Sequence, residues 1–145
     1  KVLGRSVIGI TKLFGEVLTR NNGFLVVRLG NVKNSYCSVM QIWKRQVNEG
    51  LPLTITHPAM SRYFLSIQHA VRLLIHAAEK GTGGSIWVMD MGEPQRIEQL
   101  AREVGGPSVA LKVIGIRPGE AMTESLMSAE EKERAVKRGR FWVIR

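Results

Sequence analysis

Cysteine and long apolar runs are scarce in this sequence. Its 145 residues include one cysteine, Cys37, which can form neither an internal disulfide nor a thiolate metal cage. No apolar run approaches the roughly 20 residues that cross a bilayer, and residues 1–10 lack the apolar stretch and cleavage site of a secretory signal. We therefore expect a cytoplasmic protein with a reduced thiol and without a membrane partner.

Acidic residues and glycine-rich phosphate loops are also scarce. The chain has 12 Asp and Glu against 21 Lys and Arg, so its net charge is +9 and its pI about 10.3. This balance favours anionic partners: nucleic acid, anionic membrane or a phosphorylated metabolite. No strand-linked G-x-G-x-x-G and no G-x-x-x-x-G-K-[ST] occurs, which excludes the two familiar loops for dinucleotides and nucleoside triphosphates. Basic residues gather between Lys132 and Arg140, where interleaved glutamates indicate a solvated helix face.

Apolar residues recur with helical and strand-like spacing in turn. Helices are predicted over residues 10–21, 38–48, 67–80 and 94–104. Strands are predicted over residues 24–29, 51–56, 86–89 and 111–116. This alternation predicts one α/β domain over residues 1–145, in which helices cover a largely parallel sheet and anions bind at strand ends.

Finer expectations follow from the same spacing. Pro94 suits the first turn of the fourth helix, and Ser38 suits the N-cap of the second. Trp43 and Trp87 fall on expected core faces. The core face of the third helix is expected to comprise Ile67, Ala70, Val71, Leu74, Ile75 and Ala78, and that of the fourth Ile97, Leu100, Ala101 and Val104.

Histidine and cysteine give no clear catalytic or metal-binding pattern. His57 precedes a proline in a predicted loop, while His69 and His76 lie seven residues apart on one predicted helix. That spacing is too long for one metal ion, so we expect no metal site. Cys37 has no histidine near it in sequence, and a reactive thiol with a partner from elsewhere in the chain stays open as an alternative.

Polar residues that follow the predicted strands form a more informative group. Asn31, Ser35, Ser38, Arg62 and Arg117 are placed where an α/β fold binds ligands. A guanidinium offers two parallel donors to a phosphate, and a helix that begins at Ser38 directs free N–H groups toward an anion. The set therefore suits a phosphate. The alternative for the two arginines is an ordinary ion pair or an exposed charge.

Five stretches of sequence together resemble one protein family. Residues 27–39, VRLGNVKNSYCSV, resemble the R-x-G-N-V-x-G-S-x-G-S-V segment of nucleotide-sugar 4,6-dehydratases of the polysaccharide-biosynthesis family, which are extended short-chain dehydrogenase/reductases. Residues 53–64 are similar to that family's strand and its T-H-P-x-M-x-R-Y-F signature. The remaining similar stretches are SVIGITKLFGE at 6–16, GGSIWVMDMGEPQRI at 83–97 and GIRPGE at 115–120.

The resemblance implies a substrate class and a set of site residues. The family acts on UDP-N-acetylhexosamines, above all UDP-N-acetylglucosamine: it oxidises C4 with bound NAD(P), eliminates water across C5 and C6, and returns the hydride to C6. Lys12 takes the place of the lysine that holds the nicotinamide ribose and supports the acid/base. By the same resemblance, Asn31, Ser38 and Arg62 contact the UDP part of the substrate, and Arg117 with Glu120 clamps its diphosphate and ribose.

The chain departs from the family pattern at several positions. Ile8 occupies the tyrosine position of the usual Y-x-x-x-K motif, and an alkyl side chain cannot transfer a proton. Some long members carry methionine there and use another acid. Asn34 and Cys37 replace two glycines of the substrate loop, while Lys1 is the one match to the lysine of the family's T-D-K motif.

The family pattern therefore predicts a half-fold. We expect the C-terminal, substrate-binding half of an incomplete Rossmann-type fold without its N-terminal dinucleotide-binding half. Such a chain binds a UDP-sugar, binds no NAD(P) alone and is inactive alone. Its exposed apolar faces predict a homo-oligomer or a cofactor-binding partner chain.

Two hypotheses from other classes stay open. One is a non-catalytic interaction or regulatory module that keeps the fold without the site. The other is a basic nucleic-acid binder, which only the net charge and Trp43, Trp87 and Trp142 favour. Because Trp43 and Trp87 are expected in the core, nucleic acid is the weaker expectation.

Overall fold

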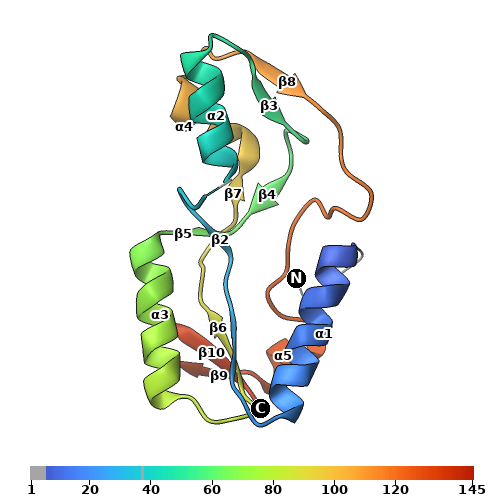
Figure 1. Ribbon diagram of the computed structural model, residues 1–145, viewed down its shortest axis with the longest axis vertical. Helices are drawn as coiled ribbons and strands as arrows, with labels where there is room; N and C mark the ends of the chain where they lie inside the picture. Colours follow the sequence, from blue (N-terminus) through green and yellow to red (C-terminus); the bar gives the residue numbers. More distant parts are fainter. Residues whose placement is uncertain (1–5, 37) are drawn as a thin grey trace. The chain divides into compact units, whose positions relative to one another are not determined.

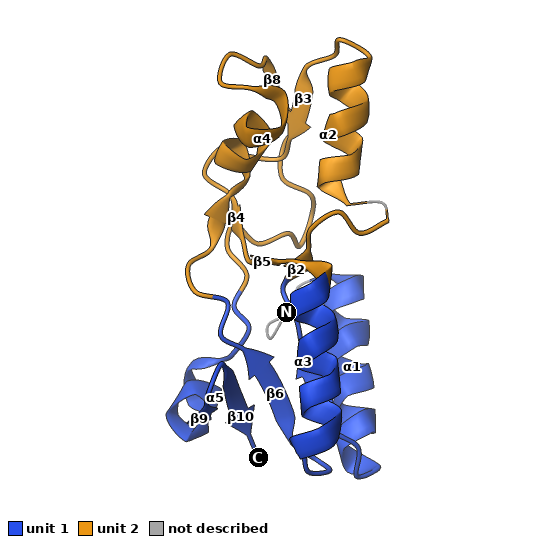
Figure 2. Ribbon diagram, turned by 90° about the vertical axis from the view of Figure 1, so that its left-hand side faces the viewer, with its two compact units in different colours: residues 1–30, 68–91, 125–145 blue, residues 31–67, 92–124 orange. Residues whose placement is uncertain are grey.

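The computed structural model describes residues 6–36 and 38–145 (Figure 1). Contacts within the chain divide it into two units, coloured separately in Figure 2. The first unit combines Lys1–Gly30, Gln68–Met91 and Ser125–Arg145, and the second combines Asn31–Ile67 and Gly92–Glu124. Each unit is thus assembled from segments that are far apart in sequence. No helix in the described part of the chain has the length and apolar character needed to span a bilayer.

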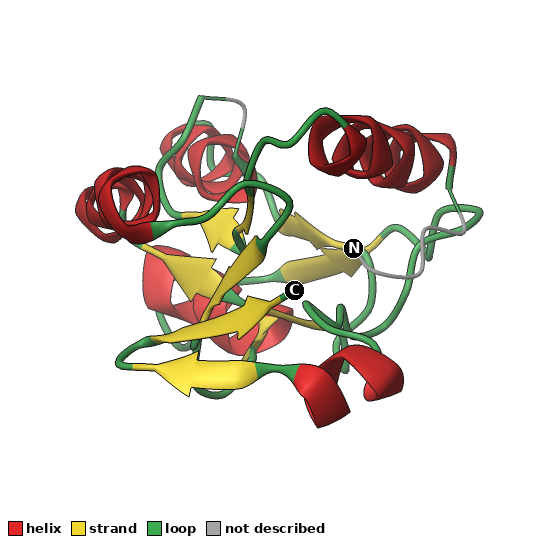
Figure 3. Ribbon diagram, turned by 90° about the horizontal axis from the view of Figure 1, so that it is seen from below, coloured by secondary structure: helices red, strands yellow, loops and turns green. Residues whose placement is uncertain are grey.

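The first unit contains a four-stranded mixed sheet. Its strand order is β1 (Val26–Arg28), β6 (Ile86–Met89), β10 (Phe141–Ile144) and β9 (Val136–Arg138). β1 pairs with β6 in parallel, whereas β10 is antiparallel to both β6 and β9. The expected largely parallel sheet is therefore wrong for this unit, because the C-terminal segment adds an antiparallel hairpin. Figure 3 shows the short helix α5 (Ala129–Arg134) running directly into that hairpin.

The basic tail is likewise not one helix face. Lys132 and Arg134 lie on α5, but Lys137 and Arg138 lie on β9. All four are exposed. The strand forms because its residues pair with β10, which continues the sheet from β6. Tertiary pairing thus overrides the local charge pattern.

Helix α3 (Ile67–Lys80) covers one face of this sheet with small side chains. Ala77 packs against the buried Trp87 and Val143. The buried residues of α3 are Ala70, Leu73 and Ala77. Of the predicted core face only Ala70 is buried, and Ile67, Val71, Leu74, Ile75 and Ala78 are exposed. The prediction is wrong because the inward side of the helix carries Ala70, Leu73 and Ala77, whereas the side with Val71, Leu74 and Ile75 points outward.

Helix α1 (Val7–Asn21) begins at Ser6, whose hydroxyl accepts a hydrogen bond from the Gly9 amide. It starts three residues earlier than the apolar spacing predicts. Gly9 is its one buried residue among those described. Its apolar side, including Ile10, Phe14 and Val17, is exposed, with Phe14 at 63%. This helix therefore presents an uncovered apolar stripe.

A buried cluster of charges joins α1, β1 and α5. Both terminal nitrogens of Arg28 donate to Glu131 at 2.8 Å, and its Nε and Nη2 donate to Glu16 at 2.8 and 2.6 Å. These hydrogen bonds from Arg28 lower the pKa of Glu131, more than burial raises it. Burial alone would lower the pKa of Arg28, but its two carboxylate partners raise it. Because Ser128 and Glu131 also form a capping box at the start of α5, the cluster fixes that helix to β1.

The second unit has a small core between two helices and a two-stranded parallel sheet. Helix α2 (Val39–Asn48) and helix α4 (Ile97–Gly105) pack on β3 (Leu53–Ile55), which pairs with β8 (Leu111–Val113). The core comprises Trp43, Leu53, Ile55, Met60, Ile97, Leu100 and Ala101. The indole N–H of Trp43 donates to the Thr54 carbonyl at 2.8 Å. The predicted core placement of Trp43 is confirmed.

Short strand pairs complete this unit. β2 (Asn31–Val32) runs parallel to β5 (Phe64–Leu65), and β4 (Ser61–Arg62) is antiparallel to β7 (Gln95–Arg96). Pro94 precedes β7 and does not start a helix, because α4 begins at Ile97. The predicted core face of α4 is confirmed, since Ile97, Leu100 and Ala101 are buried and the partly buried Val104 packs against the same cluster.

Candidate functional site

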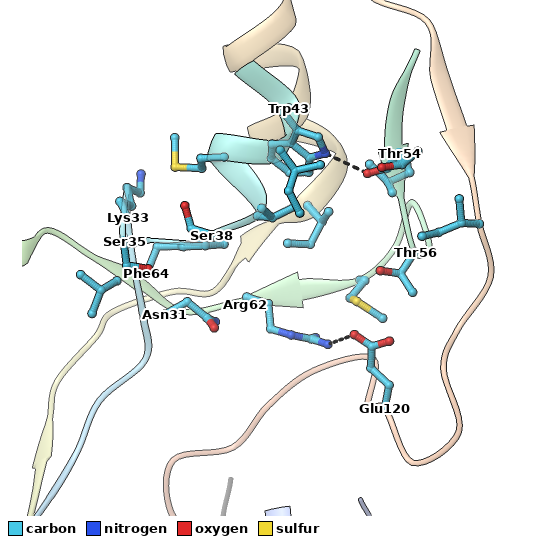
Figure 4. Close-up of a pocket in the computed structure, with 18 of the residues that line it drawn as sticks. Asn31, Lys33, Ser35, Ser38, Trp43, Thr54, Thr56, Arg62, Phe64 and Glu120 are labelled. Atoms are coloured by element: carbon cyan, nitrogen blue, oxygen red, sulfur yellow. Dashed lines mark hydrogen bonds and ion pairs between the residues drawn. The ribbon is translucent and has the colours of Figure 1, made fainter. Parts of the chain in front are cut away.

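A cavity of about 420 Å³ lies within the second unit (Figure 4). Its floor is apolar and includes Trp43, Met60, Ile97 and Phe64. Its polar lining residues are Asn31, Lys33, Ser35, Ser38, Thr54, Thr56, Arg62, Arg117 and Glu120, together with the phenol Tyr36. The structure thus brings together the five polar residues expected to converge, and adds Glu120. Such a combination of an apolar floor and a few polar groups is typical of small-molecule sites.

Ser38 is the polar group with the most unusual surroundings. It occupies the N-cap position of α2, as predicted, but its side chain makes no capping hydrogen bond. Its hydroxyl oxygen is buried and has no hydrogen-bond partner within the described chain. Buried polar atoms are nearly always satisfied, so this unpaired hydroxyl distinguishes Ser38 from the other polar residues of the cavity.

Arg62 is buried and already heavily engaged. Its Nη1 donates to the carbonyls of Ser61 and Met122 at 2.8 and 3.0 Å. Its Nη2 donates to Glu120 at 3.3 Å, and its Nε lies 3.4 Å from a Glu124 carboxylate oxygen. The ion pair that sequence reasoning allowed as the alternative is therefore present. A ligand can reach only the small remaining part of this guanidinium.

Arg117 and Glu120 are held in one turn. The Arg117 amide donates to a Glu120 carboxylate oxygen at 3.3 Å, and the Glu120 amide donates to the Arg117 carbonyl at 3.0 Å. The side chain of Arg117 is exposed. The Glu120 carboxylate is thus shared between this turn and Arg62, while the Arg117 guanidinium stays available to a ligand.

Two glycines of the family's substrate loop are replaced in this chain, by Asn34 and Cys37. The backbone at Asn34 has a conformation that glycine adopts readily. Asn34 has φ +59°, a left-handed conformation that asparagine tolerates better than most residues. Its side-chain oxygen accepts a hydrogen bond from Lys44 at 3.3 Å. Asn34 therefore occupies a backbone conformation that favours glycine. Cys37, the other replacement, lies outside the described residues, as does Lys1.

The remaining candidate, Lys12, belongs to the first unit. It lies on α1 and is exposed, as is Ile8 four residues before it. Lys12 does not line the cavity. The structure therefore brings five of the six named site residues together and gives Lys12 a place on a different unit.

The contacts of His57 and His76 and the burial of Trp43 and Trp87 indicate structural roles for these residues. His76 stacks on Phe141 with ring centres 5.0 Å apart, and His57 accepts a hydrogen bond from the Ala59 amide. No group of three or more His, Cys, Asp or Glu side chains within the described ranges could hold a metal ion. Trp43 and Trp87 are 0% and 2% exposed, so neither can stack on a nucleic-acid base.

Lys33 and Phe64 line the cavity but were not singled out from the sequence. Lys33 directly follows β2 and belongs to the turn at residues 33–34, so strand alternation gave no signal for the direction of its side chain. Phe64 directly faces Asn31 in the β2–β5 register, a pairing that the sequence does not reveal.

Comparisons with known proteins identify the family. The family described as polysaccharide biosynthesis protein matches residues 2–145. EpsC of Bacillus subtilis, named a probable polysaccharide biosynthesis protein, is 44% identical over 138 residues. CapD of Staphylococcus aureus, named a capsular polysaccharide biosynthesis protein, is 37% identical over 139 residues. Each alignment covers 87% of this chain and 23% of the relative. The chain thus spans about a quarter of the length of these curated relatives.

Solved structures identify the fold. The X-ray structure of Pen from Bacillus thuringiensis matches with a TM-score of 0.89 at 27% identity, over 99% of this chain and 49% of Pen. A dTDP-glucose 4,6-dehydratase from Streptomyces venezuelae, solved with NAD bound, matches with a TM-score of 0.74 at 17% identity, over 89% of this chain and 45% of that one. A Bacillus cereus UDP-glucuronic acid 4-epimerase, in complex with UDP-glucuronic acid and NAD, matches with a TM-score of 0.68 at 23% identity, over 83% and 43%. The last two likenesses concern the fold alone. This chain therefore belongs to the polysaccharide biosynthesis protein family and has the α/β fold of part of an extended short-chain dehydrogenase/reductase.

Proposed function

We propose that this chain forms the sugar-nucleotide-binding part of an enzyme that modifies a UDP-N-acetylhexosamine for polysaccharide synthesis, as 4,6-dehydratases do. The observation that carries the proposal is the cavity of the second unit, which joins an apolar floor, an unpaired buried hydroxyl and an available guanidinium. The names of EpsC and CapD support a role in polysaccharide synthesis. The UDP-sugar in the epimerase complex supports the ligand class.

Five of the lining residues have a proposed part in ligand binding. Arg117 pairs with the diphosphate, because its guanidinium is exposed and carries two parallel donors. Glu120 accepts hydrogen bonds from the ribose hydroxyls. Ser38 and Asn31 donate to oxygens of the UDP part, and Arg62 holds Glu120 in place while offering its remaining Nη2 hydrogen.

The nicotinamide cofactor fits the described residues poorly. The sequence has no glycine-rich dinucleotide loop, and Ile8, four residues before Lys12, cannot transfer a proton. Lys12 remains the single residue proposed to contact the cofactor. We therefore assign no hydride step to this chain and propose that it neither holds NAD(P) nor turns over alone.

The exposed apolar stripes of α1 and α3 support a protein partner. Phe14, Val17, Val71 and Ile75 are all between 46% and 63% exposed. Such uncovered apolar surface favours association. We propose either a second copy of this chain or a chain that supplies the cofactor site. Size-exclusion chromatography with light scattering tests the first of these.

Calorimetric titration tests the proposed ligand directly. We expect the purified chain to bind UDP and UDP-N-acetylglucosamine and not NAD. Arg117→Ala is expected to weaken UDP binding about tenfold or more, the scale of a charge-assisted hydrogen bond. Arg62→Ala is expected to weaken it by roughly 1.5 to 3 kcal/mol, provided that circular dichroism shows a folded variant.

Arg45→Ala is the matched control for both substitutions. Arg45 lies in the same unit with 71% of its side chain exposed, and it does not line the cavity. Its replacement should leave UDP affinity unchanged. A folded wild-type chain that binds no UDP species would refute the proposal and favour an interaction module that has kept the fold without the site.

A further inference from the structure

Lys33 is a cation at the cavity that has no acidic partner within the described chain. Its side chain is half-buried and lines the cavity, and its ammonium lies 5.9 Å from the centre of the Phe64 ring. Among the described residues, the ion pairs of the second unit join other side chains, and none includes Lys33. A cation–π contact restrains the ammonium but leaves its hydrogen-bond donors free.

The backbone fixes where this lysine lies. Its amide donates to the Leu65 carbonyl at 2.8 Å, directly after the β2–β5 register. In Figure 4, Lys33 and Ser35 lie on one side of the cavity, whereas Arg62 and Glu120 lie on the other, with Ser38 nearer to Lys33. Lys33 therefore supplies positive charge at the end of the cavity remote from Glu120.

The other charged side chains described around the cavity nearly neutralise one another, which leaves Lys33 as the uncompensated cation among them. Arg62 is shared by Glu120 and Glu124, so that group carries one negative charge in excess. Arg117 offsets this excess and leaves the wall close to neutral. A ligand with two phosphates brings at least two negative charges, and a further cation close to them adds favourable Coulomb energy and charge-assisted hydrogen bonds. Among the described lining residues, Lys33 is the cation that remains.

We propose that Lys33 is a further ligand-binding residue, whose ammonium pairs with the sugar-bearing phosphate of the nucleotide diphosphate. This inference rests on the proposed function. Glu120 holds the ribose and Arg117 the adjoining part of the diphosphate, so the opposite end of the cavity receives the distal, sugar-bearing phosphate. Ser38 lies between the two ends and donates its unpaired hydroxyl to the same diphosphate.

Comparison of UDP with UMP isolates this contact, because UMP lacks the distal phosphate. In calorimetric titrations at low salt, Lys33→Met should weaken the binding of UDP and of UDP-N-acetylglucosamine about tenfold or more. The affinity for UMP should stay within about twofold of wild type. Lys33→Arg keeps the charge and should restore most of the preference for UDP over UMP.

Lys44→Met is the matched control, since Lys44 bonds to Asn34 and does not line the cavity. It should leave both affinities unchanged. Equal weakening of UDP and UMP by Lys33→Met would overturn the inference, as would an unchanged ratio of their affinities. If the wild-type chain binds no UDP at all, the proposed function fails first, and the inference falls with it.

Discussion

Replacement of Glu131 by glutamine should destabilise the first unit in a pH-dependent manner. Glu131 receives hydrogen bonds from both terminal nitrogens of Arg28, each 2.8 Å long, and a third from the Ser128 amide at 2.8 Å. Its side chain is 11% exposed. Glutamine keeps one acceptor oxygen, but it places an NH₂ group against the N–H groups of Arg28.

At neutral pH the free energy of unfolding should fall by about 2 to 3 kcal/mol. Charge-assisted hydrogen bonds contribute roughly 1.5 to 3 kcal/mol each, and the amide of glutamine would still accept some of the hydrogen bonds that Glu131 receives. Arg28 keeps its ion pair with Glu16 at 2.6 Å, so the substitution does not leave a buried charge without a counter-ion. Because Arg28 lowers the pKa of Glu131 in the folded state, the folded chain holds this proton more weakly than the unfolded chain. The stabilisation that ionised Glu131 provides is therefore complete above about pH 5, where glutamates of the unfolded chain are ionised. It is lost as the pH falls through the pKa that Glu131 has in the folded chain.

Urea unfolding at a series of pH values between about 3 and 7 measures both effects. Wild type should lose stability toward acid more steeply than Glu131→Gln, and the two curves should converge at low pH. Glu130→Gln is the matched control, because Glu130 is an exposed residue in the same first turn of α5. Parallel curves for wild type and Glu131→Gln would refute the reasoning, as would a loss at neutral pH no larger than that of the control.

Three further substitutions test other parts of the second unit. Ser38→Ala should change the free energy of unfolding by less than about 0.5 kcal/mol, since no hydrogen bond is lost, yet weaken UDP binding severalfold in calorimetry. Asn34→Ala should destabilise by about 1 kcal/mol in urea because its φ is +59°, whereas Asn34→Gly should be close to neutral. Trp43→Phe removes the bond to the Thr54 carbonyl and should cost about 1 to 3 kcal/mol in the same assay; no loss would contradict the assigned role of that bond.

Sequence spacing predicts best those elements whose apolar residues leave only one way to pack. The strand at 86–89 coincides with β6, whose four residues are all buried. Helix α4 has its predicted face inward because Leu100 and Ala101 sit at helical spacing below Ile97. By contrast, α3 has apolar residues on two sides, and periodicity cannot decide which side packs. The buried side is the one with Ala70, Leu73 and Ala77, and the two alanines on it allow close approach to the neighbouring elements.

Four of the strands that periodicity missed, β2, β4, β5 and β7, are held by partners far away in sequence. β2 pairs with β5 and β4 with β7, and each of these strands has two residues. A two-residue strand carries no alternation to detect. The polar cavity residues were nevertheless found, because they follow predicted strands and an α/β fold gathers strand ends. Lys33 was not found, because its role depends on which other charges are neutralised.

Two arginines of this chain show why charge neutralisation decides function. Arg28 and Arg62 are both buried and each contacts two glutamates. The carboxylates around Arg28 are at most 14% exposed, so this cluster serves the fold. Glu120, beside Arg62, is 23% exposed and lines the cavity, so the same arrangement there shapes a binding surface. In both clusters the guanidinium is compensated, and an anionic ligand must be held by the cations that are not.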